Sequence, residues 1–326
     1  MAMRLWGVAR WAGLVVTGFL LAGLVWSPEL SLDVLWNILI PLVPASLLIS
    51  PAIWRNVCPL ATLNILSNRS SGNIFSDRSS GRRLGLTLLP GAELIGIALL
   101  LVLVPARRFL FNEDGLALAI TVATVALLAL VLGAVFQFKA GFCNAICPVL
   151  PVERLYGQHP LLQLSDSRCV PCQRCTMRGC LDLGPAQSIP AVVGRSWGSS
   201  RWLLSPYGAF AAAFPGFVVG YSTLNDGQLA RAGDVYMNVA LWMAVSYLGV
   251  VLVTVVLRAS AGLMINLLAA VAFGLYYWFA AEAITNAFDI AGIPTLMIRV
   301  TAGLLVLYWL ARAVPRTPIS QSAMSA

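Results

Sequence analysis

The residues with the clearest chemical potential are four closely spaced cysteines, in the run Cys169-Val-Pro-Cys172-Gln-Arg-Cys175-Thr-Met-Arg-Gly-Cys180. Gaps of two residues let a tight loop direct three thiolates at three corners of one iron–sulfur cubane. The usual ferredoxin run places its fourth cysteine three residues later and before a proline, whereas here the gap is four residues and Leu181 follows. We therefore take the first three as firm ligands of a [4Fe-4S] cluster and Cys180 as the leading fourth.

Zinc is the alternative metal for four thiolates. Its cysteine pairs normally bracket a longer finger, so the compact run favours the cluster over a zinc site. Arg168, Arg174 and Arg178 lie in or beside the run and would offset the negative charge of a thiolate-bound cluster or attract an acidic partner.

The other three cysteines belong to two related motifs that end in Cys-Pro. One reads Trp54-Arg-Asn-Val-Cys58-Pro59, and the other reads Cys143-Asn-Ala-Ile-Cys147-Pro148. Each follows a pair of predicted helices, which indicates an internal duplication. If the copies converge, Cys58, Cys143 and Cys147 form a second cluster with Cys180 or a non-cysteine ligand, or share ligation with the run. Structural turns and a redox-active thiol set are the alternatives.

The composition places these cysteines in a membrane protein. Hydrophobic residues make up 59% of the 326 residues and charged residues only 10%, far from the globular norm. A spanning helix needs about 20 apolar residues, because each backbone amide must bond within its own helix in lipid. We expect an all-α, polytopic bundle of about eight transmembrane helices with a small cytoplasmic ferredoxin-like loop. The expected helices cover 7–26, 34–54, 84–106, 116–138, 203–223, 235–257, 262–283 and 292–312.

The distribution of charge predicts how the chain is oriented. Eight crossings place all but four of the 21 basic residues on one side, which the positive-inside rule identifies as the cytoplasm. We expect a multi-pass protein of the bacterial inner membrane, with both termini and all seven cysteines on the cytoplasmic side. In that reducing compartment, clustered thiols indicate metal or redox chemistry rather than disulfides. Topology and anionic lipid explain the net charge of +8 without nucleic acid.

Three parts follow from this topology. Residues 1–138 hold the first four transmembrane helices and a cytoplasmic Cys-Pro loop. Residues 139–202 form the cytoplasmic cysteine-rich iron–sulfur loop. Residues 203–326 hold four further transmembrane helices and a cytoplasmic tail.

Several other cofactors are excluded by missing residues. The single histidine, His159, cannot build a bis-histidine haem site, and no Cys-x-x-Cys-His is present for a c-type haem. No glycine-rich nucleotide fingerprint occurs. Within the predicted helices, Glu93 and Arg299 are charges that cost several kcal/mol at membrane depth. They could pair with each other, line a quinone site or carry protons, and a structural ion pair is the alternative.

At the cysteine motifs the chain resembles the membrane-bound ferredoxin-type 4Fe-4S family. That family includes the electron-supply subunit of periplasmic nitrate reductase, the nitrous-oxide reductase regulator and the cytochrome oxidase assembly ferredoxin (the NapH, NosR and CcoG type). The resemblance covers roughly residues 34–185 and implies helix pairs that end in Cys-x3-Cys-Pro, followed by an iron–sulfur loop. The family carries two such proline motifs and two four-cysteine runs. This chain has Trp54 in place of one motif cysteine, and only one run.

These features predict an iron–sulfur electron-transfer component rather than a complete enzyme. It would pass electrons between a quinone pool or soluble donor and a partner redox protein or respiratory complex. An assembly factor that supplies electrons for metal-centre biogenesis is the second hypothesis. A structural subunit of such a complex is the third.

Overall fold

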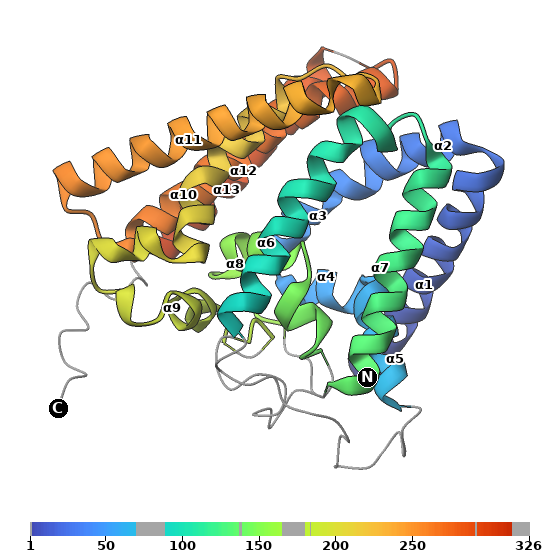
Figure 1. Ribbon diagram of the computed structural model, residues 1–326, viewed down its shortest axis with the longest axis horizontal. Coiled ribbons are helices and arrows are strands. Elements are labelled where there is room, and N and C mark those ends of the chain that lie inside the picture. The colour runs from blue at the N-terminus through green and yellow to red at the C-terminus, as the bar shows by residue number, and fades with distance from the viewer. Residues whose placement is uncertain are drawn as a thin grey trace. The chain divides into compact units, whose positions relative to one another are not determined.

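The computed structural model describes residues 2–69, 89–136, 139–164, 180–182, 184–290 and 292–314. All the elements that these residues form are helices (Figure 1). The chain divides into two compact units, Met1–Ser188 and Ile189–Ala326. Cys169, Cys172 and Cys175 lie outside the described residues, as do the other residues of 165–179 and residue 183 of the predicted iron–sulfur loop.

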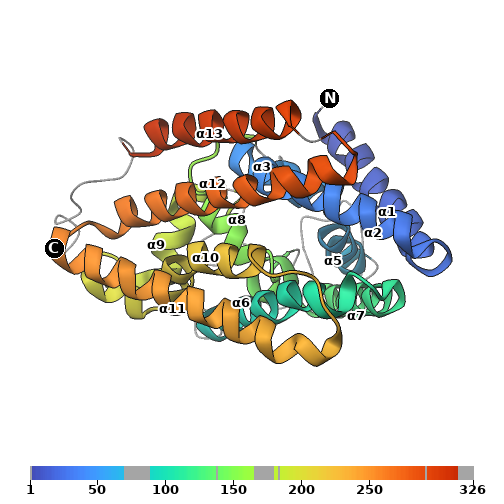
Figure 2. The same cartoon turned by 90° about the horizontal axis from the view of Figure 1, so that it is seen from above.

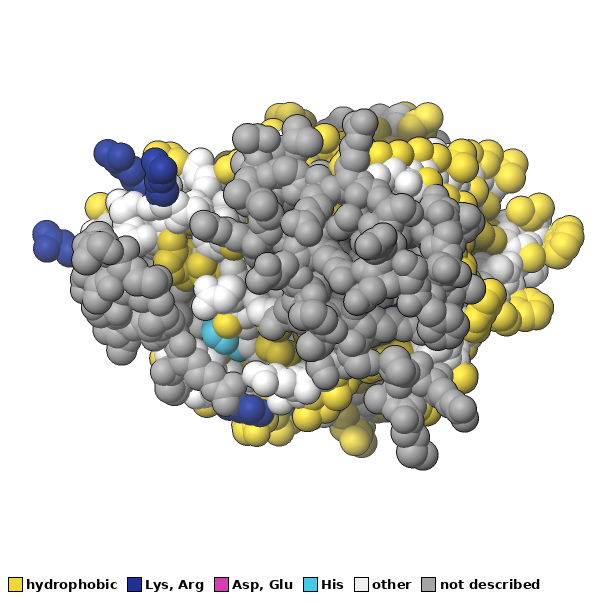
Figure 3. All heavy atoms as spheres, turned by 90° about the horizontal axis from the view of Figure 1, so that it is seen from below, with side chains coloured by type: hydrophobic (Ala, Val, Ile, Leu, Met, Phe, Trp, Pro, Cys, Tyr) yellow, Lys and Arg dark blue, Asp and Glu magenta, His cyan; other side chains and the backbone are white. Residues whose placement is uncertain are grey.

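Among the described residues, seven helical segments are long and apolar enough to cross a membrane, which makes the chain a multi-pass membrane protein. They are Leu5–Trp26, Pro28–Ile49, Gly91–Phe111, Gly115–Val135, Leu229–Leu257, Ala261–Ala287 and Ile293–Ala313. Large hydrophobic side chains lie on their outer surfaces, as in Figure 3, where yellow side chains surround the face seen from below. Such surfaces are stable in lipid rather than in water.

The first unit contains four of these spans and several short helices at their ends. Its helices are α1 (Ala2–Trp26), α2 (Pro28–Val34), α3 (Ile40–Ile49), α4 (Pro51–Val57), α5 (Pro59–Arg69), α6 (Leu89–Ala106), α7 (Gly115–Val135) and α8 (Leu150–Gly157). Three π-helical segments, η1 (Leu35–Leu39), η2 (Arg107–Phe111) and η3 (Phe142–Ile146), and the 3-10 turn η5 (Pro185–Gln187) complete it. In Figure 2, α5 lies beside α7, and the two pack extensively.

Proline fixes where the second membrane span ends. We predicted one helix over 34–54, but the span begins at Pro28 and ends at Ile49. Ser50 is extended (φ −164°, ψ 121°) because the residue before a proline avoids the helical region. Pro51 then starts α4 as a separate short helix, which carries Arg55 and leads to Cys58. The sequence prediction was wrong here because it ran the helix through Pro51.

The second unit contains the remaining three spans and a shorter helix. Its helices are α10 (Pro206–Ser222), α11 (Ala232–Leu257), α12 (Ala261–Ala287) and α13 (Ile293–Ala313), with 3-10 turns η6 (Gly194–Ser196), η7 (Ser200–Leu204) and η8 (Leu229–Arg231). α9 (Ser188–Val193) lies at the boundary of the two units.

The helix predicted over 203–223 is confirmed as α10, but it is not one of the seven candidate spans. It has 17 residues, because Ser205 is extended before Pro206 and the helix begins only there. Most of its side chains are buried against α11 and α12, and a row of neighbouring aromatic rings 5.0–6.3 Å apart runs along it. That α10 crosses the bilayer, and so provides the eighth crossing, stays a prediction.

Close backbone packing positions both Cys-Pro motifs in the first unit. A Cβ at Gly13 of α1 would lie 2.1 Å from the carbonyl oxygen of Val57, the residue before Cys58. A Cβ at Gly96 of α6 would lie 3.1 Å from the carbonyl oxygen of Cys147. Small residues permit such approaches between helices in membranes. α1 and α6 therefore pack closely against the backbone of the two Cys-Pro motifs.

Candidate functional site: buried cysteines at the helix ends

The two Cys-Pro motifs have matching local backbones. Cys58 ends α4 with φ −56° and ψ 122°, and Cys147 ends η3 with φ −59° and ψ 124°. Both conformations follow from the proline that comes next, which disfavours the helical region at the cysteine. The match supports the internal duplication that we predicted from the two motifs.

The three motif cysteines come together in one buried cluster. Cys58, Cys143 and Cys147 are each less than 9% exposed and share a core with Ala61, Ala129, Phe142, Leu150 and Leu181. Trp54 packs against the same core. We call Cys58, Cys143 and Cys147 the helix-end cysteines. Residues almost ninety positions apart are thus neighbours, as the duplication required.

Burial keeps these thiols protonated. It raises the pKa of Cys58 to about 11 and that of Cys143 to about 12, and it raises the pKa of Cys147 as well. The negative charges of Glu153 and of the neighbouring thiols add to the effect at Cys147. A thiol must lose its proton to bind a metal, so iron would displace protons here. Without a metal these cysteines would be inert toward most reagents.

Arg55 joins the parts of this site through three side-chain hydrogen bonds. Its Nη2 donates to Asn144 Oδ1 (2.5 Å), its Nη1 to Glu153 Oε2 (2.8 Å) and its Nε to Asp182 Oδ1 (2.9 Å). Lys139 Nζ lies 3.5 Å from the other oxygen of Asp182. The side chains of this network are all buried, so removing one would leave an uncompensated polar group. The network ties α4 to η3, α8 and the segment after Cys180.

The charges in this network determine the ionisation of Asp182. Burial alone would raise the pKa of this carboxyl, but the positive charges of Arg55 and Lys139 lower it to about 2. Asp182 is therefore ionised and holds the segment that follows Cys180 in place.

Cys180 lies close to this network. It is partly exposed, and its charge would interact with that of Arg55. Leu181 is 1% exposed and belongs to the same core as the helix-end cysteines. The last residue of the four-cysteine run is thus held next to the two Cys-Pro motifs.

One polar atom in the site has no partner among the described residues. Asn144 is 4% exposed, and its side-chain nitrogen Nδ2 makes no hydrogen bond there. Arginine only donates hydrogen bonds, so the oxygen of Asn144 must face Arg55 and its amide nitrogen must face elsewhere. A buried, unused donor beside cysteines fits a site that holds thiolate and sulfide sulfur, which are hydrogen-bond acceptors.

Within the described ranges, no group of three or more histidine, cysteine, aspartate or glutamate side chains is arranged around a single metal ion. The four-cysteine run is mostly outside those ranges. A polynuclear cluster is larger than one ion, and its ligands lie correspondingly further apart.

The two intramembrane charges each have a partner within their own unit. Glu93 lies four residues from the start of α6 and accepts a hydrogen bond from Arg154 Nη1 of α8 (2.7 Å). Arg299 of α13 donates to Glu282 Oε2 (3.2 Å) and to the carbonyl oxygen of Trp278 (3.0 Å), both on α12. Each of the two charges therefore has an ion-pair partner on a neighbouring helix of its own unit.

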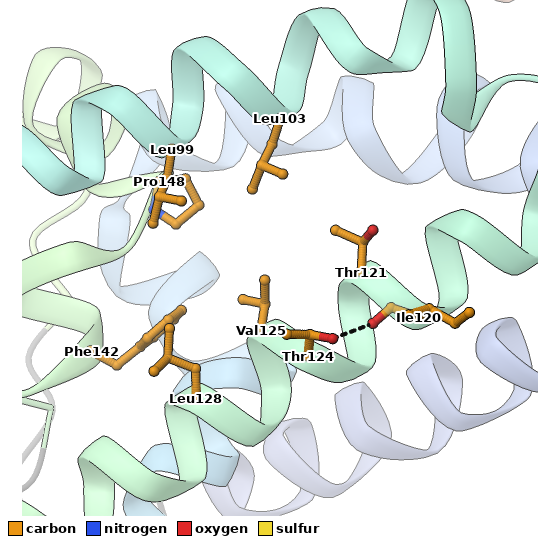
Figure 4. Close-up of a pocket in the computed structure, with 9 residues that line it drawn as sticks. All are labelled: Leu99, Leu103, Ile120, Thr121, Thr124, Val125, Leu128, Phe142 and Pro148. Carbon is orange, nitrogen blue, oxygen red and sulfur yellow. Dashed lines mark hydrogen bonds between the residues drawn. The ribbon is translucent and has the colours of Figure 1, made fainter. Parts of the chain in front are cut away.

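A cavity of about 310 Å³ lies between α6 and α7 in the membrane-spanning part of the first unit (Figure 4). Its lining is almost wholly apolar: Leu99, Leu103, Ile120, Thr121, Thr124, Val125, Leu128, Phe142 and Pro148. Figure 4 shows Leu99 and Leu103 across the gap from the α7 side chains, with Phe142 and Pro148 at one end. Those two residues flank Cys143 and Cys147 in sequence, so the cavity reaches the second Cys-Pro motif.

Sequence reasoning missed Arg55, Asn144, Glu153 and Asp182. Arg55 and Asn144 occupy corresponding positions of the two motifs, three residues before the cysteine of Cys-Pro, and that position was a usable signal. The sequence gives no such signal for Glu153 and Asp182, because their partner Arg55 lies about a hundred residues away in the chain.

Fold and site together define an all-helical, multi-pass membrane protein with a buried cysteine cluster at one end of its helices. No protein-family model matches the sequence, and comparisons with curated proteins and with solved structures gave no match. The ferredoxin-type resemblance therefore rests on the cysteine motifs themselves.

Proposed function

We propose that this chain is an inner-membrane electron-transfer protein that binds a [4Fe-4S] cluster at its cysteine motifs. The observation that carries the proposal is the convergence of cysteines from both Cys-Pro motifs in one buried core, beside the end of the four-cysteine run. A structural role alone gives no reason to gather Cys58, Cys143 and Cys147 in one core.

The residues of the chain would hold and tune the cluster. Cys169, Cys172 and Cys175 are the proposed loop ligands, and Cys180, a helix-end cysteine or a group other than cysteine supplies the fourth ligand. A bound cluster supplies one-electron transfer. Apolar walls around the helix-end cysteines exclude water, and Arg55 fixes the relative positions of both motifs and of the segment after Cys180.

We further propose that a membrane quinone exchanges electrons with the cluster, with quinol as the donor or quinone as the acceptor. The cavity between α6 and α7 lies in the apolar layer, and its volume of about 310 Å³ is at the lower end of the range for small-molecule pockets. It extends to Phe142 and Pro148, beside the motif cysteines, so a quinone ring there would be close to a cluster. Thr121 and Thr124 donate to backbone carbonyls (2.8 Å each), which leaves their oxygens free to accept from quinol hydroxyls.

Quinol-dependent reduction of the purified protein in lipid vesicles tests this function. We expect quinol to produce the electron paramagnetic resonance signal of a reduced cluster, and Leu103→Trp, which fills the cavity, to slow its appearance. Val104→Trp is the matched control, because Val104 is the next residue of α6, is 37% exposed and does not line the cavity. An iron-free protein would refute the proposal. A cluster that no quinol reduces would instead favour a soluble donor or the assembly role, in which a partner enzyme is made without its metal.

A further inference from the structure

We infer that Cys180 completes a metal site with Cys58, Cys143 and Cys147, and that this site holds an iron–sulfur cluster separate from the one bound by Cys169, Cys172 and Cys175. Because the chain has seven cysteines, the fourth ligand of the loop cluster is then a group other than cysteine. The inference rests on the proposed function and deepens it. It assigns the last cysteine of the run to the helix ends rather than to its own loop.

The geometry of the duplicated motifs provides the first step. Arg55 and Asn144 occupy corresponding positions and hydrogen-bond to each other at 2.5 Å. Contact between equivalent positions is what an approximate two-fold axis produces. Cys58 and Cys147, equivalent to each other and alike in backbone conformation, therefore lie on opposite sides of that axis.

The second step is the missing fourth thiol. Symmetry pairs Cys143 of one motif with position 54 of the other, and position 54 is Trp54, which packs against the cysteine core. The two motifs thus supply three thiols where a cubane needs four ligands. The fourth must come from another part of the chain.

The third step is the anchoring of Cys180 at this place. Leu181 is buried in the core of the helix-end cysteines, and Asp182 is bound to Arg55 at 2.9 Å and lies 3.5 Å from Lys139. The amide of Gly184 donates to the carbonyl oxygen of Cys180 (3.0 Å), which forms a turn after it. The contacts of Leu181 and Asp182 therefore hold Cys180 beside the helix ends. In two-cluster ferredoxins too, the fourth cysteine of a run binds the other cluster.

The fourth step is the unused donor. Arg55 orients the Asn144 amide so that its Nδ2, which has no partner in the described part, is available to a sulfur atom. Hydrogen bonds from amides to cluster sulfurs are a known influence on reduction potential. A site of four thiols at which a donor is already in place fits a cluster better than a set of inert buried thiols.

Loading such a site involves no oxidation or reduction of the protein. Each thiol loses its proton as its sulfur bonds to iron, so one proton leaves per ligand. The four thiolates bind a preassembled cluster, which the cluster-assembly machinery of the cell would deliver.

Iron content of paired variants tests the inference on the full chain, purified without oxygen. We expect Cys180→Ser, Cys147→Ser and Cys172→Ser each to retain about half of the wild-type iron and sulfide, because each removes one of two clusters. Cys180→Ser with Cys147→Ser should lose no more than either alone, whereas Cys180→Ser with Cys172→Ser should lose nearly all. Losses at one site do not add, and losses at separate sites do.

The opposite pattern would overturn the inference. If Cys180→Ser with Cys172→Ser keeps about half of the iron while Cys180→Ser with Cys147→Ser keeps none, Cys180 belongs to the loop cluster. Iron that is absent already in the wild type would refute the proposed function instead, so the two failures are distinct. Trp54→Cys in the Cys180→Ser background gives a second test, since it supplies the thiol that symmetry places there. We expect it to restore iron, and a content that stays at the Cys180→Ser level would count against the two-fold site.

Discussion

The contact between α1 and the first Cys-Pro motif gives the most direct prediction about how the fold holds its cysteines. Gly13 lies against the carbonyl oxygen of Val57, and an alanine Cβ at this position would lie 2.1 Å from that oxygen. Ordinary contact begins at 3.4 Å, so Gly13→Ala must move the two segments apart by about 1.3 Å. Gly18, on the same helix, has no atom within 4 Å of the equivalent Cβ and provides the control.

The two substitutions should change the free energy of unfolding in opposite directions. Gly18→Ala adds a better helix former in open space and should stabilise α1 by up to about 1 kcal/mol. Gly13→Ala offers the same gain, but overpacking against a backbone carbonyl costs about 1–3 kcal/mol. Because Val57 directly precedes Cys58, the displacement would also move a proposed ligand. We therefore expect Gly13→Ala to be the less stable variant and the one that loses iron.

Equilibrium unfolding in detergent micelles, together with iron quantification, checks both parts of this prediction. Gly18→Ala should unfold at the same or a higher denaturant concentration than wild type and keep its iron. If Gly13→Ala matches Gly18→Ala in both measurements, α1 does not press on the first motif, and the reasoning about its position is wrong.

Three further outcomes are expected from the ion pairs. Arg55→Leu should lower the free energy of unfolding by about 3–5 kcal/mol, since it leaves Glu153 buried without its partner. Adding Glu153→Leu should restore much of this free energy, and a loss well below this range in Arg55→Leu alone would contradict the reasoning. Glu93→Leu should be comparably costly and be largely repaired by Arg154→Leu, as a double-mutant cycle in the same unfolding assay would measure. Arg299→Gln should leave iron content and quinol-dependent reduction unchanged, and a loss of reduction would revive Arg299 as part of a quinone site.

The membrane helices were predictable because long apolar runs have few alternatives in lipid. Seven of the eight predicted helices correspond to candidate spans, and α10 is the shorter eighth helix. The main error, at 34–54, came from Pro51, whose effect on Ser50 ends the helix early. Periodicity cannot locate such an end when the residues on both sides are equally apolar.

The site was predictable only in part. Motif spacing indicated that Cys58, Cys143 and Cys147 could meet, and they do share one core. The carboxylate partners of Arg55 were not predictable, because Glu153 and Asp182 are distant in sequence and no local pattern links a buried arginine to a distant carboxylate. Asn144 becomes informative only once its oxygen is seen to be used and its nitrogen is not.

The central claim, that these cysteines hold iron–sulfur clusters, is tested most directly by one measurement on the wild-type chain. The protein should be purified from its membrane under strictly anaerobic conditions, and its iron, zinc and acid-labile sulfide determined together with the electron paramagnetic resonance spectrum after reduction. Our account predicts iron and sulfide in equal amounts, a cubane signal and no stoichiometric zinc. A chain that contains zinc, or neither iron nor sulfide, would contradict it.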